Sequence, residues 1–111
     1  MQAGHKLHTA AEFERARRAR DRLMDDLFVV QCVKNEKREA RLGMAVAIRA
    51  AGNAVSRNRL RRLIRESFRM HRQEMPAVDV LVTARAAAAK AGNSAIFESL
   101  ARHWRALGRS A

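Results

Sequence analysis

Arginines crowd one segment of the chain, residues 57–72, which reads RNRLRRLIRESFRMHR and holds seven arginines and one acidic residue. In a helix, residues four positions apart share a face. One face would carry Arg57, Arg61, Arg65 and Arg69, with Asn58, Arg62 and Arg72 on the same side. The other would carry Leu60, Leu63, Ile64 and Phe68. Because planar guanidinium groups pair well with phosphate oxygens, the arginine face predicts a track for a phosphate backbone.

The arginine row makes the isolated helix less stable. Like charges at spacing four each disfavour a free helix by about 0.2 to 0.5 kcal/mol. Burial of the four apolar side chains, at roughly 1.5 to 3 kcal/mol each when complete, outweighs that cost. Only Glu66 offers local compensation. We therefore interpret the row as a binding surface and not as an ordinary solvated face.

The charge of the whole chain points to the same kind of partner. The 111 residues include 23 Lys and Arg against 11 Asp and Glu, a net charge of +12. A polyanionic ligand is expected, and the preference for Arg over Lys favours nucleic acid. No apolar run approaches the roughly 20 residues needed to span a bilayer, and residues 1–8 lack the apolar stretch of a signal peptide. We expect a cytoplasmic protein with no membrane partner.

The sequence offers no catalytic or metal-binding set. The histidines His5, His8, His71 and His103 follow none of the usual zinc spacings, and the carboxylates are scattered. The single cysteine, Cys32, lies in an apolar run and is expected to be a small core residue. We predict no catalytic residue, no metal site and no cofactor bound by the protein alone.

The elements that would position the arginines begin with a helix over residues 10–20, started by a capping box at Thr9 and Glu12. Phe13 is the only large apolar residue of this helix, so the helix should border a ligand instead of lying fully buried. Residues 27–33 predict a strand, and residues 41–49 a second strand that forms a hairpin with the first.

The second of these strands has two contrasting faces. Leu42, Met44, Val46 and Ile48 should face the core, whereas Gly43, Ala45 and Ala47 leave the opposite face shallow. Two interpretations stay open for the shallow face. Its small residues either pack under a helix or line a groove for a ligand.

The rest of the chain predicts a long central helix over residues 54–75, started by Asn53 and stopped by Pro76. A third strand follows at residues 78–83 and a loop at residues 84–90. After Gly92 a closing helix should place Ile96, Leu100, Trp104 and Leu107 on one buried face, with His103 as a partly buried packing residue. We expect one domain over residues 1–111, with an ordered core of about residues 7–107.

Three segments carry a resemblance to a known family: LGMAV at residues 42–46, GNAV at residues 52–55 and, above all, RNRLRRLIRESFR at residues 57–69. They resemble the protein component of bacterial ribonuclease P, and the resemblance extends over residues 7–107. It implies an α+β fold, a single-domain α/β sandwich in the order αββαβα. It also implies an uncommon left-handed βαβ crossover through the Arg-rich central helix.

The resemblance also implies a function. Such a protein is the RNA-binding subunit of an endoribonuclease, ribonuclease P, that removes the 5′ leader of precursor tRNA. Its partners are the ribonuclease P RNA subunit and precursor tRNA, and the RNA with bound Mg²⁺ performs the cleavage. By position, the residues implied to bind the RNA subunit are Arg57, Asn58, Arg59, Arg61, Arg62, Arg65 and Arg69.

Residues implied to bind the single-stranded leader are Phe13, Arg17, Val29, Gln31 and Ala45. Phe13 could stack on a leader base or be a buried core residue. Three positions depart from the family pattern: Gln31 replaces an aromatic residue, Ile48 replaces a lysine, and Arg17 replaces an apolar residue.

Two other classes of protein deserve comparison. A basic ribosomal or nucleic-acid-packaging protein would share the charge and the basic helix, but not the resemblance along the whole chain. A protein-only nuclease would need carboxylates grouped to hold metal, and the acidic residues show no such pattern.

Overall fold

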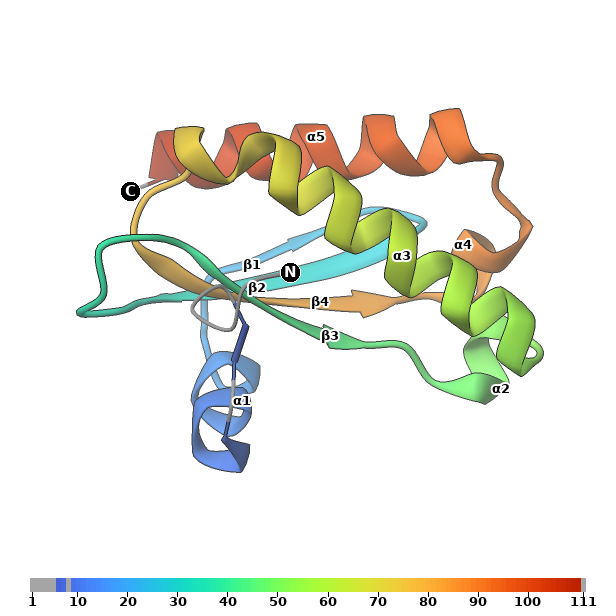
Figure 1. Cartoon of the computed structure of the whole chain (residues 1–111), viewed down its shortest axis with the longest axis horizontal. Helices are drawn as coiled ribbons and strands as arrows, with labels where there is room; N and C mark the ends of the chain where they lie inside the picture. Colours follow the sequence, from blue (N-terminus) through green and yellow to red (C-terminus); the bar gives the residue numbers. More distant parts are fainter. Residues whose placement is uncertain (1–5, 8, 111) are drawn as a thin grey trace.

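A four-stranded sheet lies at the centre of the molecule, between two long helices on one face and a short helix on the other (Figure 1). The computed structural model describes residues 6–7 and 9–110. The elements follow one another as α1 (Ala10–Arg17), β1 (Arg22–Met24), β2 (Phe28–Lys34), β3 (Arg41–Ala45), α2 (Ile48–Ala51), α3 (Ala54–His71), the short 3-10 helix η2 (Arg72–Glu74), β4 (Val78–Ala84), α4 (Ala86–Lys90) and α5 (Asn93–Ser110). This is a mixed α+β domain, as expected.

The strand order is β1-β2-β4-β3. The predicted hairpin joined the segments that form β2 and β3, and it is wrong because these two strands are not neighbours. β4 lies between them, antiparallel to β2 and parallel to β3. Alternation along a strand shows which face is buried but not which strand lies beside it. The pairing was therefore hidden from local patterns.

The parallel pair β3 and β4 is joined through α3, which crosses one face of the sheet (Figure 1). Both strands run in the same direction in that view, with β3 nearer the viewer and α3 above them. The connection is therefore left-handed, an exception to the usual right-handed rule. The long arginine-rich helix is in this way fixed above the β3 edge of the sheet.

The predicted strand over residues 41–49 ends early, at Ala45. Ile48 opens the short helix α2 and is 55% exposed, so its expected place in the core is wrong. Val46 is the last inward-pointing residue of this segment, and the chain then turns. The turn closes at Gly52, whose φ of 95° lies in the left-handed region that glycine tolerates.

Further element boundaries differ from expectation, among them that of the central helix, which ends at His71 and is followed by η2 instead of running to residue 75. The first helix ends at Arg17 and not at residue 20, and the chain then forms β1, which was not predicted. Residues 86–90, expected as a loop, form the short helix α4, because the buried Ala88 anchors a run of good helix formers. The capping box at Thr9 and Glu12 is confirmed.

The main core lies between the sheet and the pair α3 and α5. The predicted apolar faces of both helices are confirmed, since Leu60, Leu63, Ile64, Phe68, Ile96, Leu100, Trp104 and Leu107 are all buried. Trp104 packs edge-on against Phe68, with ring centroids 6.0 Å apart, and its Nε1 donates a hydrogen bond to Ser67 Oγ at 2.8 Å. His103 is buried in this face as well. Because α3 buries its apolar side here, its arginines point away from the core.

Candidate nucleic-acid interface

A buried ion pair holds α1 against the sheet. Arg41 on β3 donates from Nε and Nη2 to the two carboxylate oxygens of Asp79 on β4, each at 2.9 Å. Arg41 also pairs with Glu12 of α1, Nη1 to Oε2, at 3.0 Å. The hydrogen bonds that Arg41 donates to Asp79 raise the pKa of Arg41. Since Asp79 is fully buried, this cluster fixes the start of α1 rather than serving as a ligand site.

The end of α1 is held by Gln31, one of the residues implied to bind leader. Its side chain is buried, and Nε2 donates to the backbone oxygen of Arg17 at 2.6 Å. A second contact, to the oxygen of Ala19, is 3.4 Å long. An amide suits this place because it reaches two carbonyls that an aromatic ring could not satisfy. The structure therefore gives Gln31 a role in placing α1.

Phe13 projects from α1 onto β3, where it lies against Gly43. A Cβ added to Gly43 would lie 2.8 Å from Cε1 of Phe13 and 2.8 Å from Cδ1 of Leu7. The glycine is therefore what lets the ring approach the strand. Phe13 is half-buried and packs beside the small cluster of Leu7, Ala16 and Leu81. Gly43 is therefore covered, as the first interpretation of the shallow face expects, while Ala45 is exposed, and the ligand groove stays a prediction.

Beyond α1 the same face of the sheet is open. The register places Met24, Val29, Thr83 and Ala45 in one row across all four strands. Val29 and Thr83 are half-buried, and Met24 is 59% exposed. Met24 belongs to the strand that sequence patterns missed, and only the strand register brings it to this row. Two implied leader residues, Val29 and Ala45, thus lie in the same row with Thr83 between them, and the apolar Met24 lies beside Val29.

Arg17 lies at the end of α1 and is exposed. It forms a salt bridge with Glu14, which also accepts a hydrogen bond from Arg18 at 3.2 Å. The hydrogen bond from Arg17 lowers the pKa of Glu14. An exposed pair of this kind contributes little to stability, so Arg17 can exchange Glu14 for a phosphate at small cost.

On α3, two of the implied RNA-binding arginines also make internal contacts. Arg57 Nε donates to the oxygen of Val46 at 2.7 Å, which fastens α3 to the end of β3. Arg59 Nη2 donates to the oxygen of Ala91 at 2.9 Å and to Asn93 Oδ1 at 2.7 Å. Asn58, between them, is exposed. These two arginines point to opposite sides of the helix, and sequence spacing alone could not reveal their anchoring role.

The remaining arginines form the outer surface of α3. Arg61 and Arg65 are half-buried, and burial together with the charges of Arg57 and Arg65 lowers the pKa of Arg61. Arg62 and Arg69 are exposed and line a shallow groove of about 180 Å³ with Arg65 and Glu66. Arg62 Nη1 lies 3.8 Å from Glu66 Oε2. We call Arg61, Arg62, Arg65 and Arg69 the arginine face.

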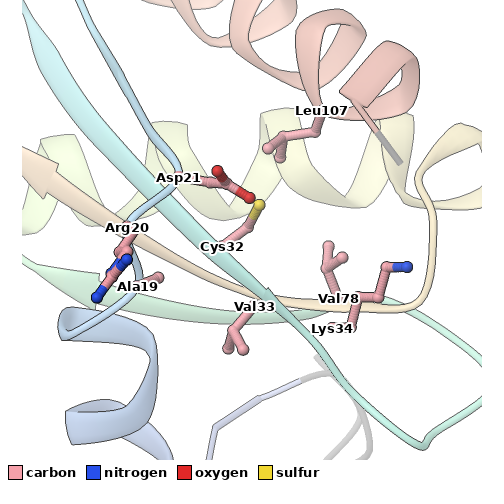
Figure 2. Close-up of a pocket in the computed structure, with 8 residues that line it drawn as sticks. All are labelled: Ala19, Arg20, Asp21, Cys32, Val33, Lys34, Val78 and Leu107. Atoms are coloured by element: carbon pink, nitrogen blue, oxygen red, sulfur yellow. The ribbon is translucent and has the colours of Figure 1, made fainter.

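A larger cavity, of about 360 Å³, lies at the β2 edge between the loop after α1 and Leu107 of α5 (Figure 2). Cys32 and Asp21 both point into this region in Figure 2. Burial, reinforced by the charge of Asp21, raises the pKa of the Cys32 thiol. The thiol is half-buried and packs against the main core, so the expectation of a small packing residue is met in part.

Within residues 6–7 and 9–110, no three His, Cys, Asp or Glu side chains are grouped so that they could hold a metal ion. Across those same residues, no helix is long and apolar enough to cross a membrane.

Known proteins share this arrangement. The family model for ribonuclease P matches residues 1–108. The ribonuclease P protein component of Coxiella burnetii is 35% identical over 97 residues, which cover 87% of this chain and 80% of that protein. That of Thioalkalivibrio sulfidiphilus is 42% identical over 83 residues, covering 75% and 69% of the two chains.

Solved structures of RNase P proteins have a similar fold. A mutant of the Staphylococcus aureus RNase P protein superposes with a TM-score of 0.85 at 32% identity, covering 96% of this chain and 89% of that one. The Thermotoga maritima RNase P protein gives a TM-score of 0.79 at 28% identity, covering 89% and 94%.

Proposed function

Because this chain belongs to the family of ribonuclease P protein components, the RNA-binding subunits of the ribonuclease P endoribonuclease, we propose that the two sides of its sheet bind two different RNAs. The arginine face of α3 binds the ribonuclease P RNA subunit. The opposite side of the sheet, beside α1, binds the single-stranded 5′ leader of precursor tRNA. The alternative of a ribosomal or packaging protein is not favoured, because the similarity covers nearly the whole chain.

The first assignment is supported by the excess of positive charge on the outer surface of α3. Arg61, Arg62, Arg65 and Arg69 gather on one side of the helix, with Glu66 as the acidic residue among them. The core does not use these side chains, since α3 buries Leu60, Leu63, Ile64 and Phe68. An RNA backbone relieves their mutual repulsion and gains from release of its counterions. Asn58 and the free edges of Arg57 and Arg59 extend this surface toward the start of the helix.

The second assignment is supported by the row Met24, Val29, Thr83 and Ala45 with Phe13 and Arg17 at its border. A single-stranded RNA needs surfaces on which bases can stack and cations that follow its backbone. Phe13 offers the ring and Arg17 the guanidinium. Gln31 contributes by holding the end of α1 in place.

Bond cleavage is assigned to the RNA subunit. The Mg²⁺ ions that activate the nucleophile would be bound by RNA phosphates, in keeping with the lack of a metal-ligand cluster among the described residues. The chain acts in the cytoplasm, where precursor tRNA is made.

Reconstitution tests the proposal. The chain is added to a bacterial ribonuclease P RNA at a low Mg²⁺ concentration at which the RNA alone cleaves precursor tRNA slowly. We expect cleavage at the mature 5′ end to accelerate, because the protein neutralises phosphate repulsion and holds the leader. No acceleration, or equal affinity for precursor and mature tRNA, would favour a packaging protein instead.

A further inference from the structure

A small cavity of about 180 Å³ opens at the outer edge of β3, between α3 and α1. Figure 1 shows β3 at the near side of the sheet, with α3 above it and α1 below it. Three cations from two parts of the chain line the cavity: Lys6 before α1, and Arg61 and Arg65 on α3. Phe13, Met44 and Leu7 supply apolar walls. We call this cavity the β3-edge pocket.

The backbone fixes the walls of the pocket. Lys6 pairs with Leu42 in a parallel bridge, and Leu7 N donates to the oxygen of Leu42 at 3.1 Å. This contact places Lys6 at the strand edge, opposite the arginines of α3. Met44, two residues after Leu42, presents its own backbone polar groups to the same edge, because these groups alternate in direction along a strand. Phe13 is held by its contact with Gly43.

The electrostatics of the pocket call for an anion. Among the described residues that line it, none is acidic. Arg61 is half-buried beside Arg57 and Arg65, and this burial and repulsion lower its pKa. Cations gathered in a partly desolvated place without an acidic partner in the lining are stabilised by a bound anion. The volume corresponds to roughly six water molecules, enough for a phosphate group and part of a sugar.

We propose that the β3-edge pocket is a nucleotide site, in which Lys6, Arg61 and Arg65 hold one phosphate while the attached nucleoside packs against Phe13 and Met44. This inference rests on the proposed function, because it takes the ligand to be RNA. It adds a place where RNA crosses the β3 edge. The β3-edge pocket then lies between the arginine face, which binds the RNA subunit, and the α1 side of the sheet, which binds the leader.

The test uses adenosine 5′-monophosphate and inorganic phosphate as probes of the whole chain, followed by the amide signals of ¹⁵N-labelled protein. We expect both probes to shift the amides of Leu7, Gly43, Met44 and Ala45, and the nucleotide to bind more tightly than phosphate. Lys6→Ala should weaken nucleotide binding by about three- to fivefold. The matched control is Lys37→Ala, which removes the same charge from the exposed loop between β2 and β3.

Equal weakening by Lys6→Ala and Lys37→Ala would show diffuse attraction to a basic protein and overturn the proposal. Equal affinities for the two probes would leave a bare anion site and overturn the nucleotide assignment. Phe13→Leu gives a second check, since it keeps an apolar side chain but should bring the affinity for the nucleotide down to that for phosphate.

The reconstituted cleavage assay separates this proposal from the proposed function. If the wild-type chain accelerates cleavage while nucleotide binding ignores Lys6, only the pocket assignment fails. If cleavage is not accelerated, the proposed function fails whatever the nucleotide does.

Discussion

At the scale of single residues, the Asp25 carboxylate joins the turn before β2 to α5. Burial alone would raise its pKa, but hydrogen bonds from Ser99 Oγ and from the backbone N–H groups of Phe28 and Leu27 lower it to about 2. His103 Nε2 lies 3.2 Å away. Burial lowers the pKa of His103, and the charge of Asp25 opposes this effect. Asp25 is therefore a charged tie between two distant segments.

Replacement of Asp25 by asparagine should make the free energy of unfolding less dependent on pH in the acid range. The folded pKa of about 2 lies below the ordinary value of 3.8, so ionised Asp25 stabilises the fold above about pH 4, and that gain is lost as the pH falls toward 2. With allowance for solvent screening, we expect Asp25→Asn to cost about 1 kcal/mol at pH 7 and almost nothing at pH 2. Thermal unfolding across this range measures the difference, and a cost independent of pH would contradict the account.

The Arg41 and Asp79 pair gives a second prediction. Asp79→Asn leaves the buried Arg41 guanidinium with Glu12 as its remaining carboxylate partner. Loss of one member of a buried pair costs about 3 kcal/mol or more. Urea unfolding should show this loss, and amide exchange should show α1 opening more readily. As a control, Glu14→Gln removes an exposed acid from α1 and should change stability little. Similar effects of the two variants would mean that the buried pair does not hold α1.

At the scale of elements, α3 contains two kinds of arginine. Arg57 and Arg59 bond to backbone oxygens of neighbouring segments, whereas Arg61 and Arg65 are crowded by like charge. Arg61→Ala with Arg65→Ala should leave the domain as stable or slightly more stable. The slope of log affinity for the RNA subunit against log salt should flatten by roughly 0.7 to 0.9 per lost phosphate contact.

The matched pair Arg57→Ala with Arg59→Ala should behave differently, because it removes anchoring hydrogen bonds as well as charge. We expect a lower melting temperature for this pair alone. If both pairs destabilise the fold equally, the arginine face is a structural element and not a binding surface.

The sequence alone predicts some of these helices and strands and misses others. Periodicity located β2, β4, α3 and α5, because each buries a regular apolar face. It missed β1, where three residues contribute the single half-buried Leu23 to the core. Periodicity also placed β3 beside β2. The strand that lies between them is β4, which comes more than 40 residues after β2 in the chain. Pairing across such a distance leaves no local pattern.

The candidate site was predictable to a similar degree. Spacing placed the arginine face correctly, since helical geometry dictates which residues share a side. The anchoring of Arg57 and Arg59, and the burial of Gln31, depend on segments that only the fold brings close. The β3-edge pocket was hidden for the same reason, because Lys6, Phe13, Met44 and Arg61 come from four separate segments.

At the scale of the whole molecule, the sheet separates two surfaces. α3 lies on one side of it and α1 on the other (Figure 1). We expect the purified chain to have no nuclease activity until the RNA subunit is added, because its described residues hold no metal-ligand cluster. Incubation of RNA-free protein with precursor tRNA measures this directly. Cleavage at the mature 5′ end by protein alone would contradict the division of labour.

The central claim is that opposite sides of the sheet serve different RNAs, and the ratio of the holoenzyme's affinities for precursor and mature tRNA tests it most directly. Only precursor tRNA carries a leader. Phe13→Leu keeps the packing on Gly43 but removes the ring, so it should weaken precursor binding by about 1 to 3 kcal/mol and leave mature tRNA unaffected. Arg62→Gln with Arg69→Gln, measured at saturating RNA subunit, should leave the ratio unchanged. If Phe13→Leu leaves the ratio of affinities unchanged, or if the ratio falls in the variant with Arg62→Gln and Arg69→Gln instead, the account is contradicted.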